Sequence, residues 1–320
     1  ISECLVGSEM CIRDRSYTGL KKNKEYTLSG VLVDKETGEP VLDQNGNQVT
    51  ATTKFKPKTA EGTAEVEFAF DATGFDGKTL VVYEELTLNG EKLAEHKDLN
   101  DEGQTIYFPG VGTTALDKDT NDHISKADKE ITIVDTVLYT NLRVGKKYTV
   151  KGILMDQETG KKVLDADGQE VTASASFTAE TKDGTVDITF KFDGSKLAGK
   201  TVVAFEDVYY KGISVGTHAD INDEEQSVHL PKIKTTAVDG ENGTKNSMAD
   251  STVIIKDTVS FENLIPGKEY TMKGVLKDQK TGKTVKAKVG TDTSEGFIIP
   301  DGAETVNFEK GSYALSLIHI

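Results

Sequence analysis

The chain of 320 residues has no tryptophan, only six prolines and only two cysteines. Cys4 and Cys11 both lie within the first fifteen residues, so the rest of the chain carries no thiol. This absence excludes a disulfide framework and a thiolate metal site from residues 16–320. No apolar run approaches the ~20 residues that a membrane-spanning helix needs, so we expect no membrane insertion within this sequence.

Basic residues are also scarce. Lysine and arginine number 38 against 53 aspartates and glutamates, which gives a formal net charge of −15 at pH 7. So acidic a balance argues against nucleic acid and against an anionic membrane as partner. The acidic turns do not have the spacing of a calcium loop: in the segment that begins at Asp165, Ser176 stands where a bidentate glutamate is required. The sequence therefore predicts no metal and no cofactor.

The two ends of the chain are related at the level of DNA. Residues 9–15 can be encoded by GAG ATG TGT ATA AGA GAC AG, and the reverse complement of that sequence contains CTG TCT CTT ATA CAC ATC, which encodes residues 315–320. The pair resembles a translated transposon-type sequencing adapter. We therefore expect residues 1–15 and 315–320 to be non-native segments that stay unpacked.

Three similar segments recur at a constant step. YTLSGVLVDKETG at 26–38 returns as YTVKGILMDQETG at 148–160 and as YTMKGVLKDQKTG at 270–282, so each step is 122 residues. A unit of this length has the size of a domain, not of a solenoid repeat. We expect a partial copy at 16–109 that lacks its first strands, a complete copy at 110–231, and a partial copy at 232–314 that lacks its last strands.

The hydrophobic period within the complete copy is two. Val186, Ile188, Phe190 and Phe192 alternate with polar residues, and turn segments such as ETGKK, DADGQ and KDGT separate short runs rich in β-branched and aromatic residues. The pattern predicts an all-β protein of tandem immunoglobulin-like β-sandwich domains, with roughly seven or eight strands each. The proline-containing joints at 108–112 and 230–234 predict units strung semi-rigidly end to end.

Polar residues interrupt the apolar faces of several strands. Burying such a group unpaired costs on the order of 1–3 kcal/mol, and more for a charge, so several in one domain are expected to contact one another. They are Thr113, Asp135, Glu206 and Gln226 in the complete copy, Glu84 and Gln104 in the first copy, and Thr235 and Asp257 in the third.

A histidine stands at a fixed distance from the glutamine. His218 precedes Gln226 by eight residues, as His96 precedes Gln104. Two buried acids close together tend to share a proton, because burial and mutual repulsion raise the pKa of one of them. A hydroxyl, a base, and a carboxamide beside a protonated carboxyl are the groups that an acyl transfer requires.

These motifs carry a resemblance to a known family. Thr113-Thr114-Ala115, Val203-Ala204-Phe205-Glu206 and the His218–Gln226 spacing resemble the VaFE-repeat family, the Thr–Gln ester-bond domains of Gram-positive surface adhesins and pilus-like stalks. The resemblance covers residues 16–314. It implies that Thr113 attacks Gln226, that ammonia leaves and that an intramolecular ester remains. By the same resemblance His218 is the general base, helped by Glu206, and Asp135 pairs with Glu206 to polarise the carboxamide.

Two points stay open at the level of sequence. Thr114 is adjacent to Thr113 and is an alternative nucleophile. The first copy keeps Glu84, His96 and Gln104 without the threonine and aspartate, and the third keeps Thr235 and Asp257 without the other groups, so we expect neither to close a bond within this chain.

Two other classes of function are weighed against the ester-linked stalk. A turnover esterase or amidase would need a nucleophile elbow, which is absent from the sequence, and room for a substrate. A stalk cross-linked by Lys–Asn isopeptide bonds, or an uncross-linked ligand-binding sandwich, is the closer alternative. We expect a non-enzymatic, extracellular, cell-wall-anchored protein whose signal peptide, anchor and ligand-binding domain lie outside this sequence.

Overall fold

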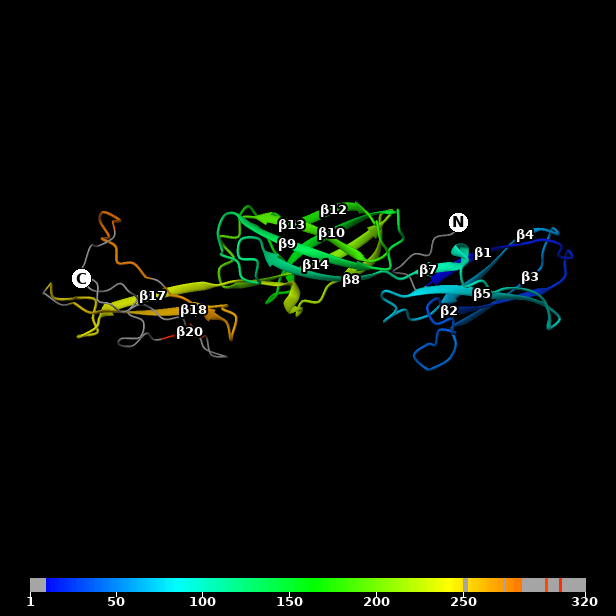
Figure 1. Ribbon diagram of the computed structural model, residues 1–320, viewed down its shortest axis with the longest axis horizontal. Helices are drawn as coiled ribbons and strands as arrows, with labels where there is room; N and C mark the ends of the chain where they lie inside the picture. Colours follow the sequence, from blue (N-terminus) through cyan, green and yellow to red (C-terminus); the bar gives the residue numbers. More distant parts are fainter. Residues whose placement is uncertain (1–9, 250–252, 273, 284–296, 299–304, 307–320) are drawn as a thin grey trace.

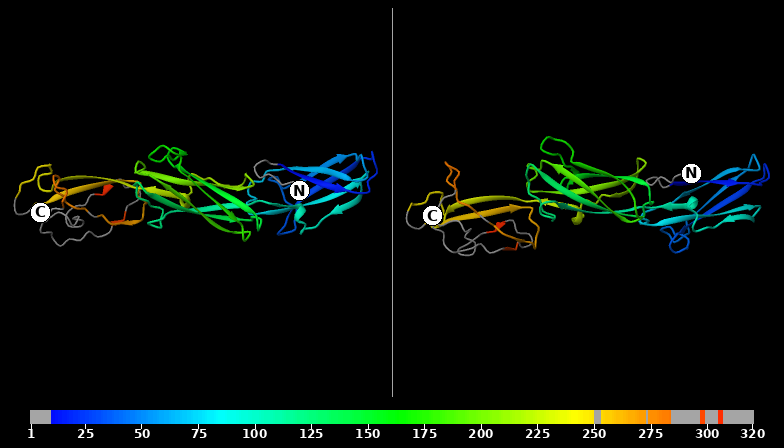
Figure 2. Two further views of the ribbon diagram at one scale, coloured as in Figure 1. Left: turned by 90° about the horizontal axis from the view of Figure 1, so that it is seen from above. Right: turned by 45° about the horizontal axis from the view of Figure 1, so that its top comes forward.

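The computed structural model describes residues 10–249, 253–272, 274–283, 297–298 and 305–306. Within these residues strands dominate, and the helical elements are two short 3-10 turns, η1 (Glu102–Gln104) and η2 (Glu224–Gln226). Figures 1 and 2 show three β-rich units arranged end to end. The predicted fold class, an all-β chain of tandem β-sandwiches, is confirmed.

The middle unit is a sandwich of two antiparallel sheets. The larger has the order β11-β10-β14-β15, with β12 also paired to β10 and β16 also paired to β14, and the smaller has the order β13-β9-β8. Its strands are β8 (Gly110–Asp117), β9 (Ile131–Thr140), β10 (Lys147–Asp156), β11 (Lys161–Lys162), β12 (Thr172–Thr178), β13 (Gly184–Phe192), β14 (Lys200–Tyr210), β15 (Ile213–His218) and β16 (Ser227–Leu230).

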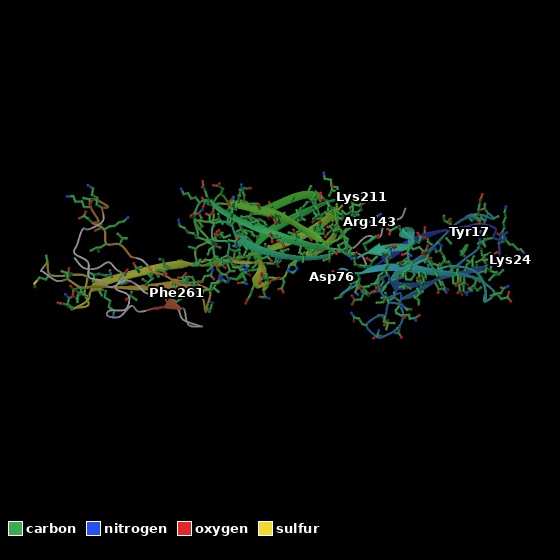
Figure 3. All side chains as sticks on the ribbon, in the orientation of Figure 1. Tyr17, Lys24, Asp76, Arg143, Lys211 and Phe261 are labelled. Carbon is green, nitrogen blue, oxygen red and sulfur yellow. The ribbon has the colours of Figure 1, made fainter. Side chains whose placement is uncertain are left out.

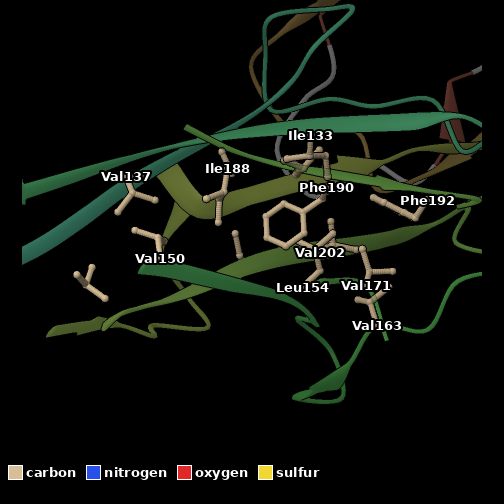
Figure 4. Close-up of a cluster of buried hydrophobic side chains, with 14 of the residues drawn as sticks. Ile133, Val137, Val150, Leu154, Val163, Val171, Ile188, Phe190, Phe192 and Val202 are labelled. Carbon is tan, nitrogen blue, oxygen red and sulfur yellow. The ribbon is translucent and has the colours of Figure 1, made fainter. Parts of the chain in front are cut away.

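The core of this unit follows from the alternation along its strands. Ile188 and Phe190 of β13 are fully buried, and Figure 4 shows the Phe190 ring among side chains from both sheets. Gly152 of β10 leaves the space that these two side chains occupy: a Cβ at Gly152 would lie 2.4 Å from Ile188 Cδ1 and 2.7 Å from Phe190 Cζ. A glycine at this position therefore lets the two sheets approach closely.

The first unit repeats much of this arrangement. Its larger sheet has the order β3-β2-β5-β6, with β7 also paired to β5, and β1 pairs with β4. The strands are β1 (Met10–Tyr17), β2 (Tyr26–Asp34), β3 (Thr50–Phe55), β4 (Gly62–Ala69), β5 (Thr79–Leu88), β6 (Glu91–His96) and β7 (Thr105–Tyr107).

Strand β1 contradicts one expectation. It pairs Tyr17 with Gly62, in the same register as Tyr139 with Gly184 in the middle unit, so β1 takes the place of β9. The prediction that residues 1–15 stay unpacked is therefore wrong for residues 10–15. The physical reason is that β4 offers a row of backbone N–H and C=O groups, and any extended segment can pair with such an edge whatever its side chains. Residues 1–9 and 315–320 lie outside the described residues.

The third unit contains β17 (Lys232–Asp239), β18 (Ile255–Glu262), β19 (Glu269–Tyr270), β20 (Phe297–Ile298) and β21 (Thr305–Val306). Strands β17, β18 and β21 form one sheet, and β19 pairs with β20. Thr235 pairs with Val259 as Thr113 pairs with Val137 in the middle unit. The described start of this unit therefore follows the same register.

An asparagine locks the first joint between units. Asn141 follows β9 with φ of 60° and is only 6% exposed. Its Nδ2 donates to the backbone oxygens of Lys78 (2.5 Å) and Phe108 (3.2 Å) of the preceding unit, and its Oδ1 accepts from Thr79 Oγ1 at 2.8 Å. One side chain thus holds the two units together through three hydrogen bonds.

The second joint repeats this lock one step later. Asn263, with φ of 62°, donates to the backbone oxygen of Lys200 at 2.6 Å and accepts from Thr201 Oγ1 at 3.0 Å. His229 Nδ1 lies 2.9 Å from Asn263 Oδ1. Because asparagine tolerates a left-handed backbone and offers both a donor and an acceptor, it suits a turn that must bond to a neighbouring unit.

Further contacts differ between the two joints. At the first, the Arg143 guanidinium lies 5.7 Å from the centre of the Tyr107 ring, and Figure 3 shows Arg143 where the two units meet. At the second, Lys268 Nζ lies 2.5 Å from an Asp122 carboxylate oxygen. Each joint therefore combines the same asparagine lock with its own charged contact.

Replacing Asn141 by glycine tests the lock. Glycine accepts the positive φ but removes three hydrogen bonds, each worth about 1 kcal/mol, so the first joint should become flexible while the sandwiches stay folded. Small-angle X-ray scattering should show a shorter mean length and a broader distance distribution, with an unchanged melting temperature. Asn89→Gly is the matched control, since Asn89 has φ of 53° in the β5–β6 turn. Wild-type scattering from the Asn141 variant would contradict this account.

Candidate functional site

The contact between Thr113 and Gln226 lies at the centre of the site. Gln226 is fully buried in η2, and Thr113 on β8 is 9% exposed. Gln226 Nε2 donates to Thr113 Oγ1 at 2.7 Å and to Glu206 Oε2 at 2.7 Å. Thr114 occupies the opposite face of β8, where it pairs with Thr136. The geometry thus favours Thr113 over Thr114 as the hydroxyl that faces the carboxamide.

The contact joins the two sheets of the sandwich. The family resemblance implies a threonine on the first strand and a glutamine on an adjacent last strand. In the structure β8 belongs to the smaller sheet, and Gln226 lies in the 3-10 turn before β16 of the larger. Asp223 caps this turn, because its carboxylate accepts from the Glu225 backbone N–H at 2.9 Å. The geometry of this 3-10 turn, and not the alternation of a continued strand, sets the inward direction of the Gln226 side chain.

Two carboxyl groups lie beside this pair. Asp135 is fully buried on β9, and Glu206 is 2% exposed on β14. Burial raises the pKa of Asp135, and burial together with the neighbouring charge of Asp135 raises the pKa of Glu206 well above its usual range. Two anions at such a site would repel each other without water to screen them. The two groups therefore hold at least one proton between them at neutral pH.

The carboxamide of Gln226 has a spare acceptor. Among the described residues, Oε1 of Gln226 and Oε1 of Glu206 have no hydrogen-bond partner although both atoms are buried. A half-turn of the amide would exchange its nitrogen and oxygen, and the two orientations are nearly equivalent in shape. In the exchanged orientation a protonated Glu206 donates to the amide oxygen, which draws electrons from the carbonyl carbon.

His218 lies at the edge of the cluster. It is the cross-strand partner of Glu206, so both side chains share one face of the sheet. Its Nε2 lies 2.8 Å from Asp223 Oδ2, and its Nδ1 lies 3.2 Å from the backbone oxygen of Val111. Both ring nitrogens are engaged away from Thr113. Direct proton transfer from Thr113 to His218 would therefore require the ring to turn.

Asp223 is a residue that the sequence reasoning missed. The hydrogen bond from His218 lowers the pKa of Asp223, which keeps this carboxylate ionised beside the ring. The first unit repeats the pair, with His96 Nε2 at 3.0 Å from Asp101 Oδ2. The signal was present in the sequence, because an aspartate follows each histidine by five residues.

The two outer units each assemble part of the set. In the first unit Gln104 is fully buried and its Nε2 donates to Glu84. The unit has no aspartate at the position of Asp135, because the register of β1 places Arg13 opposite Val66, where the middle unit has Asp135 opposite Ile188. In the third unit Thr235 is exposed on β17 and burial raises the pKa of Asp257. Among the described residues, only the middle unit brings all the predicted groups together.

The shared proton predicts how stability depends on pH. A folded-state pKa above the unfolded value means that the folded protein binds more protons, so the free energy of unfolding falls as pH rises from about 5 through the folded pKa, by up to about 1.4 kcal/mol per pH unit for one proton. Chemical denaturation of Thr113→Val, which has no nucleophile, should show this fall. Adding Glu206→Gln should flatten it.

Glu225→Gln in the same background removes an exposed carboxylate of η2 that lies outside the buried pair, and it serves as the control. Parallel stability curves for Thr113→Val with and without Glu206→Gln would mean that the pair is not protonated.

No group of three histidine, cysteine or acidic residues in the described part of the chain is arranged to hold a metal ion. The described residues also contain no helix that is long and apolar enough to cross a membrane.

Comparison with solved structures found weak similarities of fold. A bacterial adhesin from Mobiluncus mulieris containing intramolecular disulfide, isopeptide and ester bond cross-links is 16% and 17% identical in two crystal forms, with 54% and 62% of this chain and 91% and 95% of that chain covered and TM-scores of 0.31. A putative beta-galactosidase from Bacteroides fragilis is 13% identical over 77% of this chain and 37% of that one, with a TM-score of 0.29. A comparison with curated proteins found no match.

A family model identifies the repeated unit. The model of the T-Q ester bond containing domain matches residues 8–108, 109–230 and 231–315, one match for each of the three units. The first match begins at residue 8, two residues before the start of β1 (Met10–Tyr17). The middle match spans the whole constellation of Thr113, Gln226, Asp135, Glu206 and His218. The chain belongs to the family of T-Q ester bond containing domains, of which it carries three copies.

Proposed function

We propose that this chain is part of the stalk of a bacterial cell-surface adhesin, and that its middle unit, residues 110–231, is stabilised by an autocatalytic ester between Thr113 and Gln226. The observation that carries the proposal is the buried contact of 2.7 Å between Thr113 Oγ1 and the carboxamide of Gln226. A neutral Glu206 beside that carboxamide supplies the polarisation that the reaction needs. Family membership supports the same chemistry.

The reaction balances without a co-reactant. Thr113 Oγ attacks the side-chain carbonyl carbon of Gln226, and the hydroxyl proton passes to a base. Glu206 donates to the carbonyl oxygen as negative charge develops on it. The bond from carbon to Nε2 then breaks, Nε2 takes up a proton, and ammonia leaves while the ester remains. His218, oriented by Asp223, is the proposed base after its ring has turned.

The position of the link suits a structure under tension. Thr113 lies near the start of the unit and Gln226 near its end, 113 residues apart. A bond between them carries force from one joint to the next without pulling the sheets apart. It also closes a long loop in the unfolded chain, which by loop entropy is worth roughly 4–5 kcal/mol where strain is small.

The reaction turns over once and the protein is not an enzyme in the ordinary sense. Thr113 and Gln226 are both buried, which leaves no room for an external substrate. By this proposal the protein is extracellular and wall-anchored, and it meets a host or surface ligand through domains outside this sequence. Nucleic acid is not a proposed partner because the net charge is −15.

The alternatives differ in their chemistry. A Lys–Asn isopeptide would need a lysine and an asparagine where this unit has Thr113 and Gln226. An uncross-linked ligand-binding sandwich would lose no ammonia, so its mass would equal that of its sequence. Peptide mapping by mass spectrometry separates these cases, because the ester joins the peptides that contain Thr113 and Gln226.

Intact mass measures closure directly. The purified chain should be lighter than its sequence by one ammonia, because only the middle unit assembles the full set of groups. Thr113→Ala and Gln226→Ala should keep the full mass and lose roughly 4–5 kcal/mol of stability, together with much of their protease resistance. The Thr114→Ala variant should still form the ester and lose one ammonia. A full mass in well-folded wild-type protein would refute the ester.

Closure rates test the surrounding groups. Glu206→Ala should slow closure about 100-fold or more, because it removes the donor to the developing oxyanion. His218→Ala and Asp223→Asn should slow it less, and Asp223→Asn should also shift the dependence of the rate on pH. His229→Gln, a histidine outside the cluster, should close at the wild-type rate. Time-resolved mass measurements after refolding give these rates, and equal rates for all variants would exclude the assigned roles.

A further inference from the structure

A groove crosses the outer face of the larger sheet of the middle unit. It is a shallow hollow of about 600 Å³, and a second hollow of about 390 Å³ shares Lys151 and Tyr209 with it. Ile153 of β10 and Phe205 and Tyr209 of β14 are at outward positions of their strands, where they are half-buried. These three side chains give the groove an apolar and aromatic floor.

Lysines surround this floor. Lys147, Lys151, Lys162 and Lys211 line the two hollows, together with three acids, Glu170, Asp207 and the buried Glu206. The Lys151 ammonium lies 4.5 Å from the centre of the Tyr209 ring, which places a positive charge where the hollows meet. Figure 3 shows Lys211 at the end of the middle unit that faces the first unit.

Glu170 and Asp207 each accept hydrogen bonds from neighbouring side chains. Glu170 accepts from Lys162 Nζ at 2.9 Å, and Asp207 accepts from Tyr209 Oη at 3.3 Å and from Ser214 Oγ at 3.4 Å. Apart from the buried Glu206, four lysines line the groove against these two acids, so the groove carries a formal excess of positive charge on a chain whose formal net charge is −15. Local positive charge on an acidic protein selects an anionic ligand of limited size, because a long polyanion would be repelled by the rest of the surface.

Hydroxyl groups complete the lining. Thr149, Thr172, Ser174 and Thr217 stand along the walls. Hydroxyls beside an aromatic floor match a sugar, which presents an apolar C–H face to the ring and hydroxyls to the walls. A peptide would bind better along an exposed strand edge, where it can add a strand, and this groove lies on the face of the sheet.

The groove is not a requirement of the fold. The positions 122 residues earlier, on the corresponding strands of the first unit, hold Glu25, Ser29, Pro40, Thr87 and Asn89 in place of Lys147, Lys151, Lys162, Tyr209 and Lys211. Both units form the same sandwich, yet only the middle one carries the lysines and the tyrosine. The first unit thus forms the sandwich without these side chains, and a ligand would explain why the middle unit carries them.

We propose that this groove binds a short acidic oligosaccharide, with sugar rings against Phe205 and Tyr209 and carboxylates beside Lys151, Lys147 and Lys211. The middle unit would then have a ligand site of its own. It does not depend on the ester between Thr113 and Gln226, because the groove lies on the opposite face of the larger sheet.

The test is calorimetric titration of the full chain with a hyaluronan hexasaccharide, which carries one carboxylate per disaccharide. Binding should weaken as salt is added, because the charged groups are exposed to solvent. Lys151→Gln should weaken it about fivefold, Lys147→Gln with Lys151→Gln more than tenfold, and Tyr209→Ala at least fivefold. Lys191→Gln, an exposed lysine on β13 of the other sheet, should leave it unchanged.

Two further probes separate the outcomes. Neutral cellohexaose should bind far more weakly, and so should a hexaglutamate peptide. Amide shifts in NMR spectra on addition of the hexasaccharide should be confined to β10, β11, β12, β14, β15 and the turn at Lys211, and absent from β2 and β5 of the first unit. No binding of hyaluronan, equal binding of the peptide, or equal weakening by Lys191→Gln would overturn the proposal. Thr113→Ala should bind like wild type, so failure of the ester and failure of the groove are distinguishable.

Discussion

The burial of two carboxyl groups between the sheets of the middle unit is the constraint on which the site depends. A buried anion is tolerated only with a partner or a proton, and the buried carboxylate oxygens of Asp135 have no hydrogen-bond partner among the described residues, so a proton on this pair of acids is the favourable state. A proton shared by the pair allows Glu206 to donate a hydrogen bond at a pH where a surface glutamate would only accept one. Without that proton the carboxamide of Gln226 would lie beside a charge that repels the developing oxyanion.

The same constraint explains why the site lies between the sheets. Apolar side chains such as Phe190 and Ile133 exclude water from the space around the carboxyls, and this exclusion raises their pKa values. Thr113 comes from one sheet and Gln226 from the segment leading into the other. The native fold therefore brings Thr113 and Gln226 together and excludes water from them in one step, so that under the proposed reaction folding itself would start the chemistry.

Some of this was predictable from sequence and some was not. Asp135 and Glu206 break an alternation of period two, and a break in an otherwise apolar face is visible in one dimension. The 3-10 turn at Gln226 could not be predicted from the sequence. The same residues at the end of a strand would also bury the glutamine, so the sequence does not distinguish the two backbone geometries. Asn141 was missed because its role depends on backbone oxygens of another unit, which have no signature in the sequence. Strand β1 was not expected because the likeness of residues 1–15 to a translated adapter concerns the origin of the segment, whereas backbone pairing with β4 does not depend on that origin.

The two faces of the larger sheet are linked through β14. Glu206 points inward to the site, while Phe205, Asp207 and Tyr209 on either side of it point outward to the groove. An ester that ties η2 and β16 to β8 would restrict sliding of β14, because β16 pairs directly with it. The distance between Lys151 on β10 and Tyr209 on β14 depends on the register between these two strands, in which Thr149 pairs with Tyr209. Under tension, a cross-link on the inner face would therefore preserve the shape of a binding surface on the outer face.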